Sequence, residues 1–133
     1  MFAWLREWIR GHPGAANAAH RRGRVGEELA AQQLRRNGFR IIERNWRCPL
    51  GELDLVATKG ALTVLVEVKT SRRRGAIPPE MRVNGRKRMK LRSLADYYLK
   101  RHRPAGDVRF DIIAVWWDLD EQVHIDHIEN AFC

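Results

Sequence analysis

The chain has 133 residues, 44% of them hydrophobic, and 25 Lys and Arg against 16 Asp and Glu give it a formal charge of +9. This size suits one domain with one core, and the hydrophobic fraction excludes a disordered chain. No apolar run approaches the roughly 20 residues of a membrane span, and two cysteines exclude a disulfide framework. We expect a cytoplasmic protein without a membrane partner. The charge favours a polyanionic partner, most commonly nucleic acid, although an arginine-rich proteome would also produce it.

The first folded element is predicted to be a helix from Gly23 to about Asn37. Apolar side chains recur there at helical spacing, and Gly38 is a typical C-terminal stop: Val25, Leu29 and Leu34 form the stripe. Residues 1–22, rich in Gly, Ala and Arg, are expected to be a flexible basic segment. The folded domain is therefore predicted to span residues 23–133.

The rest of the chain predicts five strands and a second helix. Strands are expected at 39–47, in the two halves of 51–70, at 108–117 and at 123–128, where β-branched and aromatic residues are common. The helix is expected from about Asn84 to Arg101, after a proline-containing loop. The order α-β-β-β-α-β-β predicts a single α/β domain with a mixed central sheet and flanking helices.

One predicted hairpin, "GELDLVATKGALTVLVEVKT" at 51–70, carries charges that would weaken a buried sheet unless they are paired or bound: Glu52, Asp54, Glu67 and Lys69. Side chains alternate between the two faces of a strand. A two-residue turn would pair Thr58 with Ala61, and a four-residue loop would pair Thr58 with Thr63. Either register places all four charged side chains on one face, and the second sets Asp54 opposite Glu67. A three-residue loop would divide them between the faces.

Two facing carboxylates about 5 Å apart repel each other, and a divalent cation that takes oxygen from both removes the repulsion. Lys69 lies one alternation beyond Glu67, within reach of an attacking water or a phosphate. The pattern predicts metal-assisted phosphodiester hydrolysis, in which the ion polarises the phosphoryl group. A solvated face with Glu–Lys cross-strand pairs is the other interpretation that the composition leaves open.

These residues resemble a known signature. "GELDLVA" followed by "VLVEVKT" is similar to the D-x(n)-E-x-K pattern of the restriction-endonuclease-like, or PD-(D/E)xK, nuclease superfamily, with Asp54, Glu67 and Lys69 at its three positions. Further motifs in order resemble the YraN family of predicted bacterial endonucleases: "GRVGEELAAQQLRRNGFRIIERNWR", the Val83-x-x-x-Lys87 stretch, "RFDIIAV" and "HIENAF". The resemblance runs from about Gly23 to the C-terminus and implies a restriction-endonuclease-like fold that uses Mg²⁺ or Mn²⁺.

The spacing is also similar to that of archaeal Holliday-junction resolvases of the same superfamily. In those proteins an acid on the first helix completes the metal site, eleven residues before a Gly-aromatic pair. Gly38 and Phe39 form such a pair here and indicate Glu27, with Glu28 as the second choice. Glu52 matches the YraN motif rather than the usual proline and is an additional candidate acid. The resemblance implies a metal ion on Glu27, Asp54, Glu67 and the Val68 carbonyl, with Lys69 orienting the water.

Two basic clusters are candidate phosphate contacts. Cations in the first turn of a helix oppose the helix dipole, whereas a bound phosphate would be stabilised there. Such contacts would position a nucleic-acid backbone without reading bases, and a merely solubilising surface is the alternative. The candidate residues are Arg72, Arg73, Arg74, Arg86, Lys87, Arg88 and Lys90.

Three further features of the last strands bear on the site. His124 and His127 are three apart on a strand and point to opposite faces, so they are not expected to share an ion. Asp111 is expected to be structural or to support the metal ligands. Trp116 and Trp117 also point to opposite faces, one towards the core and the other towards a subunit contact.

The leading hypothesis is a metal-dependent nuclease that hydrolyses DNA rather than RNA, with branched or junction DNA as a candidate substrate. Symmetric cleavage of a junction would require a homodimer. A non-catalytic nucleic-acid-binding module, or a structural subunit, could use the same fold as a scaffold. The intact Asp/Glu/Lys set favours the enzyme.

Overall fold

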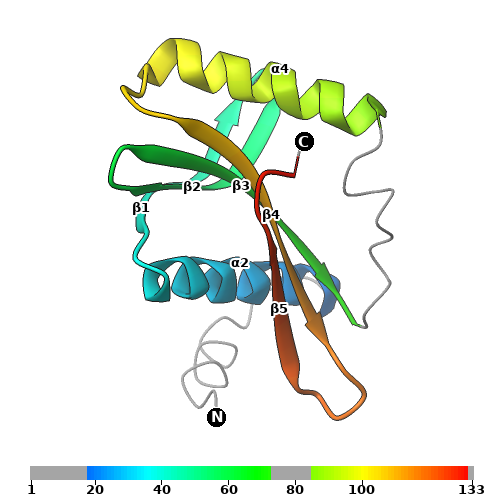
Figure 1. Cartoon of the computed structure of the whole chain (residues 1–133). Helices are drawn as coiled ribbons and strands as arrows, with labels where there is room; N and C mark the ends of the chain where they lie inside the picture. The colour runs from blue at the N-terminus through cyan, green and yellow to red at the C-terminus, as the bar shows by residue number, and fades with distance from the viewer. Residues whose placement is uncertain (1–17, 73–84, 132–133) are drawn as a thin grey trace.

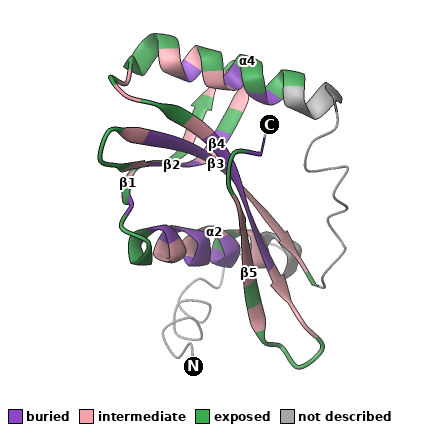
Figure 2. Ribbon diagram, viewed as in Figure 1, coloured by how far each residue is buried: buried purple, intermediate pink, exposed green. Residues whose placement is uncertain are grey.

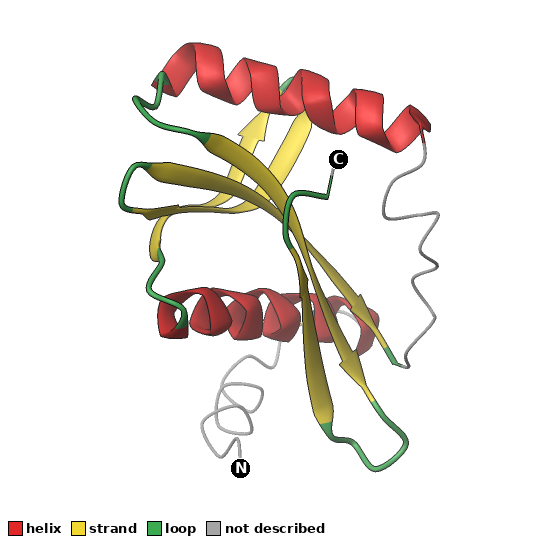
Figure 3. Ribbon diagram, viewed as in Figure 1, coloured by secondary structure: helices red, strands yellow, loops and turns green. Residues whose placement is uncertain are grey.

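The computed structural model describes residues 18–72 and 85–131. It contains two helices and five strands, in the predicted order: α2 (Ala18–Arg36), β1 (Arg40–Cys48), β2 (Gly51–Lys59), β3 (Leu62–Ser71), α4 (Gly85–His102), β4 (Val108–Trp117) and β5 (Val123–Ile128). The strands form one sheet in the order β1-β2-β3-β4-β5, with α2 on one face and α4 on the other (Figures 1 and 3). The predicted α/β domain with a mixed sheet is confirmed.

The sheet is antiparallel except where β3 pairs with β4 in parallel. A parallel neighbour requires a crossover connection, and α4 lies within it on one face of the sheet (Figure 1). None of the helices in the described part of the chain is long and apolar enough to cross a membrane.

Helix α2 begins at Ala18, so the predicted start at Gly23 is wrong. The added residues are mainly Ala and Arg, which favour helices, and they extend the helix into a segment that was expected to be flexible. The predicted end is confirmed: Gly38 has φ 88°, and the Phe39 N–H donates a 2.9 Å hydrogen bond to the Leu34 carbonyl. This is the geometry of a glycine-terminated helix. Residues 1–17 lie outside the described residues, and so does the predicted loop at 71–82 apart from its first two positions, Ser71 and Arg72.

The central strands are buried on both faces (Figure 2). Even-numbered residues of β3 pack with α2 in one cluster, which includes Val64, Val66 and Leu29. Odd-numbered Leu65 packs instead with Phe110 and the apolar face of α4. Val68 also packs against the α2 cluster, and the residues on either side of it therefore project to the α4 face.

Gly26 brings α2 unusually close to the sheet. A Cβ atom built on Gly26 would lie 2.1 Å from Cγ2 of Thr70 on β3, a separation that real Cβ atoms do not show. Only glycine allows this approach without displacement of the helix or of Thr70. The next residue of the helix, Glu27, is thereby held beside the middle of the sheet.

Candidate active site

The register of the charged hairpin decides where its side chains lie. Thr58 pairs with Thr63, the second of the two predicted registers, and the ladder continues to Leu55 and Val66. Asp54 and Glu67 are the residues that follow this last pair. The hairpin therefore brings the two carboxylates to neighbouring positions at the centre of the sheet.

Asp54 is tied to β3 through its carboxylate. Its Oδ2 atom accepts a 2.7 Å hydrogen bond from the Val68 N–H. Burial raises the pKa of Asp54, and the charges of Glu67 and Glu52 raise it further, against the opposing effects of the Val68 hydrogen bond and the Lys69 ammonium group. Asp54 therefore interacts electrostatically with three other predicted site residues: Glu52, Glu67 and Lys69.

Glu67 and Lys69 form an ion pair on the α4 face of β3. The Lys69 Nζ atom lies 2.9 Å from Glu67 Oε1, and the two side chains are 34% and 20% exposed respectively. The pair is therefore partly shielded from water but still accessible. The alternative interpretation of these charges was Glu–Lys pairing between strands, whereas this pair lies within β3, and the charge of Asp54 acts on it from β2.

Glu27 joins this group from α2. Burial raises its pKa to about 7, with further contributions from Asp54 and Glu52, whereas a hydrogen bond from Asn45 and the charge of Arg24 lower it. A carboxylate with such a pKa is commonly found at functional sites, because burial and like charges are gathered there.

Glu28 has a different environment and is not part of the group. Its carboxylate lies 2.6 Å from the Arg44 guanidinium and 4.0 Å from that of Arg35. One residue along a helix turns a side chain by about 100°, so Glu27 and Glu28 face different neighbours. Of the two acids that the sequence left open, Glu27 is the one beside Asp54.

Asn45 is the residue that the sequence analysis missed. It has φ 49° within β1, a left-handed conformation that Asn tolerates better than most residues. Trp46 and its partner on β2, Leu53, pack with the α4 cluster, whereas Leu55, two residues further along β2, packs with the α2 cluster. The strict alternation expected for β2 therefore fails beside Asp54. An Asn inside the strand-forming run "ERNWR" is the signal that could have indicated this irregularity.

Glu52 lies at the edge of the group. Its carboxylate is 3.2 Å from the Arg47 side chain, to which it is opposed in the β1–β2 ladder, and it is 48% exposed. It acts on Glu27 and Asp54 through its charge. Its predicted role as an additional acid stays a prediction.

Within the described residues, no three carboxylate, imidazole or thiol groups are gathered closely enough to hold a metal ion together. The Lys69 ammonium group is paired with Oε1 of Glu67, and the Val68 N–H donates a hydrogen bond to Oδ2 of Asp54. Carboxylate and carbonyl oxygens are nevertheless the donors that Mg²⁺ and Mn²⁺ prefer. The donor chemistry fits such an ion, and rotation of carboxylate side chains would be required to bind it.

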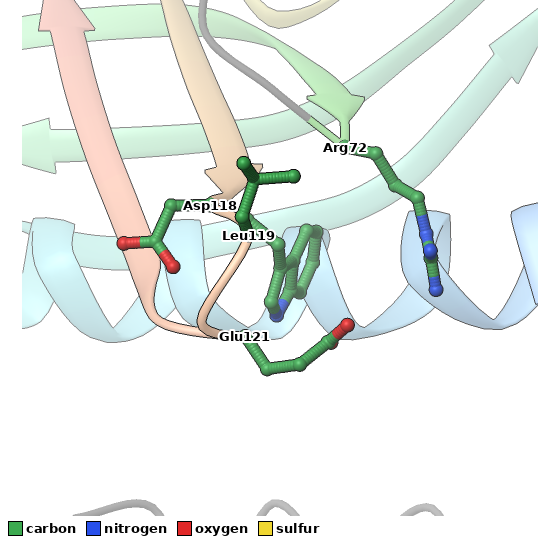
Figure 4. Close-up of a pocket in the computed structure, with 5 residues that line it drawn as sticks. Arg72, Asp118, Leu119 and Glu121 are labelled. Atoms are coloured by element: carbon green, nitrogen blue, oxygen red, sulfur yellow. The ribbon is translucent and has the colours of Figure 1, made fainter.

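The structure describes two of the seven predicted phosphate contacts in full. Arg72 lines a hollow of about 350 Å³ with Trp117 and the turn between β4 and β5, on the α2 side of the sheet (Figure 4). Lys90 is exposed, and its Cε atom lies 4.0 Å from the position of a Cβ atom on Gly51, at the start of β2. Arg73 and Arg74, and the side chains of Arg86, Lys87 and Arg88, lie outside the described residues. The contacts stay predictions.

Asp111 is fully buried and forms a separate network. Its carboxylate accepts hydrogen bonds from the Arg109 guanidinium and the Asn130 N–H, and it lies 2.7 Å from His127 Nε2. Burial by itself would raise the pKa of Asp111, but these hydrogen bonds hold it below its ordinary value. The network ties the C-terminal segment to β4, a structural role. His124 contacts Asp118 instead, so the two histidines have separate partners.

The fold and this group define the class of the protein: a single α/β domain with a mixed sheet, in which an aspartate of one central strand interacts with an acid of a helix and with an acid and a lysine of the next strand. The chain belongs to the YraN family, since the model described as "Uncharacterised protein family UPF0102" matches residues 26–115.

Relatives match nearly their whole length. A UPF0102 protein of Moorella thermoacetica is 48% identical over 114 residues, covering 84% of this chain and 95% of that one. A UPF0102 protein of Pelotomaculum thermopropionicum is 44% identical over 119 residues, covering 88% and 99%. Among solved structures, Pyrococcus furiosus SfsA in complex with Ca²⁺ overlaps 81% of this chain and 62% of its own, with a TM-score of 0.39 and 16% identity.

Proposed function

We propose that this protein is a divalent-metal-dependent nuclease that hydrolyses DNA phosphodiester bonds. One observation carries the proposal: the partly buried Asp54 of β2 interacts electrostatically with Glu27 of α2 on one side and with Glu67 and Lys69 of β3 on the other. Their burial and repulsion cost stability, and a structural role would be served better by neutral residues. Membership of the YraN family, with its nuclease-like sequence motifs, supports the same function.

The residues that would hold Mg²⁺ or Mn²⁺ are Glu27, Asp54, Glu67 and the Val68 carbonyl. When bound, the ion supplies a Lewis acid that polarises the phosphoryl group and favours ionisation of water. It would also compensate the repulsion from neighbouring carboxylates that adds to the effect of burial in raising the pKa values of Glu27 and Asp54.

Lys69 has a different task, because an ammonium group cannot bind a cation. Its position 2.9 Å from Glu67 keeps a positive charge beside the carboxylates. From there Lys69 would orient the attacking water or stabilise the negative charge that develops on the phosphate. Loss of Lys69 should therefore slow the reaction without removing the capacity to bind the ion.

DNA is the favoured substrate because the formal charge of +9 suits a polyanion and because two basic clusters follow Lys69 in the sequence. We propose branched or junction DNA as the substrate, cleaved by a homodimer where cleavage is symmetric. A cytoplasmic location would give access to such DNA.

The test is to incubate the purified full chain with supercoiled, single-stranded and four-way-junction DNA in Mg²⁺, Mn²⁺ or EDTA. We expect metal-dependent cleavage, a higher melting temperature with metal, and loss of both effects in Asp54→Asn. Lys69→Ala should keep the thermal shift and lose cleavage by about a hundredfold or more. The Glu28→Gln variant, which alters an adjacent but differently paired acid, is the control and should behave as wild type.

The results separate the nuclease from its rivals. Wild-type rates in Lys69→Ala, or equal thermal responses of wild type and Asp54→Asn, would contradict the mechanism. DNA binding without cleavage under every metal condition would favour the non-catalytic binding module.

A further inference from the structure

Trp116 and His124 form a stacked aromatic pair on neighbouring strands. Their ring centroids are 4.0 Å apart and the ring planes differ by 10°. Polar contacts fix both rings: the Trp116 indole N–H donates to Asp126 at 3.1 Å, and His124 Nε2 lies 2.8 Å from an Asp118 oxygen. The pair is therefore held in a defined orientation by side chains of the β4–β5 hairpin.

This pair lies on the same face of the sheet as Glu67 and Lys69. Val115, Trp117, Val123 and Ile125 pack with the α2 cluster, so the residues that alternate with them project to the other face. The same reasoning places Glu67 and Lys69 on that face, because Val66 and Val68, which alternate with them along β3, pack with the α2 cluster. Neither Trp116 nor His124 belongs to the apolar cluster beneath α4. The aromatic pair is an extension of the proposed active face and not part of either core.

The sheet register gives its distance from the site. Ser71, Trp116 and His124 lie opposite one another on β3, β4 and β5. Lys69 is two residues before Ser71 on β3. With about 3.3 Å per residue and about 4.8 Å between strands, the Cα atoms of Trp116 and His124 are about 8 and about 12 Å from that of Lys69. Those distances correspond to a base about two to four nucleotides from a phosphate at Lys69, at an axial rise of about 3.4 Å per nucleotide.

A flat aromatic pair at this distance suits an unpaired nucleobase. The His124 side chain is 43% exposed, so a base can add to the stack from solvent. Every base has a π-face, and stacking on aromatic side chains is the usual means by which proteins hold single strands without reading their sequence. Bases inside a duplex are already stacked on their neighbours and would gain less.

We propose that Trp116 and His124 form a stacking platform for an unpaired base of single-stranded DNA a few nucleotides from the phosphate to be cleaved. This rests on the proposed nuclease function and specifies its substrate: DNA with single-stranded nucleotides next to the cleavage point, as in a free strand or the arm of a branch. The phosphate would lie at Lys69, and a base about two to four nucleotides away would lie on the His124 ring.

The experiment compares two labelled oligonucleotides of equal length and charge, one of thymidines and one with abasic residues. Their affinities for the full chain are measured by fluorescence anisotropy in EDTA, which separates binding from cleavage. Wild type should bind the thymidine strand about fivefold or more tightly than the abasic strand. His124→Ala and Trp116→Ala should bring this ratio close to one, and His124→Phe should retain it.

His102→Ala is the matched control. His102 is also stacked on an aromatic ring, that of Tyr98, with centroids 4.0 Å apart and a 13° angle, but at the far end of α4. Its loss should leave the ratio unchanged. Circular dichroism checks the fold of each variant. If Trp116→Ala does not fold, the ratio of affinities for the thymidine and abasic strands in His124→Ala decides the question.

Equal affinity of wild type for the two strands, or an unchanged ratio in His124→Ala, would overturn the platform. Sedimentation of the same variants tests the subunit contact predicted for one of the tryptophans: loss of self-association with an unchanged ratio overturns the platform too. Cleavage in Mn²⁺ is scored separately. A base-dependent ratio without cleavage would support the platform and reject the nuclease, whereas cleavage without that ratio would do the reverse.

Discussion

Replacing Glu27 with Gln should stabilise the protein above neutral pH. Glu27 is a partly buried acid whose pKa rises to about 7, from an ordinary value of 4.5. Its ionised form is therefore less favourable in the folded chain than in the unfolded one. Gln is isosteric, can keep a hydrogen bond with Asn45, and carries no charge at any pH.

The sign and the size of the change in unfolding free energy follow from the linkage between ionisation of Glu27 and folding. Below pH 4.5 the acid is protonated in both states and costs nothing, between 4.5 and about 7 the cost grows, and above 7 it is complete. The pKa difference sets an upper limit of about 3 kcal/mol. Glu27 is only about half buried, and solvent screening reduces the expected gain to about 1 kcal/mol. That gain corresponds to about 4 °C in melting temperature for a domain of this size.

Thermal unfolding of wild type and Glu27→Gln from pH 4.5 to pH 8.5, in EDTA, checks this directly. The curves should coincide at the acidic end and separate towards neutral pH, with the variant more stable. Glu28→Gln is the control: it loses an ion pair with Arg44 and should not be stabilised at any pH. A Glu27→Gln difference that is absent at pH 8, or equal at both ends of the range, would refute the reasoning.

Three further outcomes are expected. Gly26→Ala should cost about 1–3 kcal/mol in urea unfolding, because its Cβ would meet Cγ2 of Thr70, and Thr70→Ser should recover most of the loss; an equal cost in both backgrounds would contradict the contact. Asp111→Asn should destabilise the chain by about 2–4 kcal/mol at pH 7. Because the pKa of Asp111 is lowered by folding, this difference should shrink as the pH of the melting series falls below about 4. Lys90→Ala should reduce the slope of log affinity for DNA against log salt by about 0.9, and an unchanged slope would exclude a phosphate contact.

The sheet could be predicted from the sequence because local patterns determine it. Alternation and apolar runs located every strand, and the hairpin turn left three loop lengths open, of which the structure has the four-residue loop that pairs Thr58 with Thr63. The end of α2 was equally local, since Gly38 adopts a conformation that few other residues tolerate. The start of α2 was not, because Ala and Arg carry no stop or start signal of their own.

The site was only partly predictable because it depends on how the elements pack. The sequence could not choose between Glu27 and Glu28, which differ by one position. Contact between Gly26 and β3 makes that choice. The same is true of Asn45, whose left-handed backbone accompanies the change of face between Leu53 and Leu55. A local irregularity of this kind interrupts the two-residue alternation of side chains between faces, on which strand prediction depends.

The parallel pair of β3 and β4 also bears on how the chain folds. Thr63 and Val108 are partners although they are about 45 positions apart, whereas β1, β2 and β3 are joined by short turns. We expect the distant pairing to form late, and until then β3 is an open edge with a run of Leu and Val that can pair with another molecule. Glu67 and Lys69 interrupt that run at its exposed end. Charges at such positions oppose aggregation, so the side chains proposed for chemistry would also protect the newly synthesised chain.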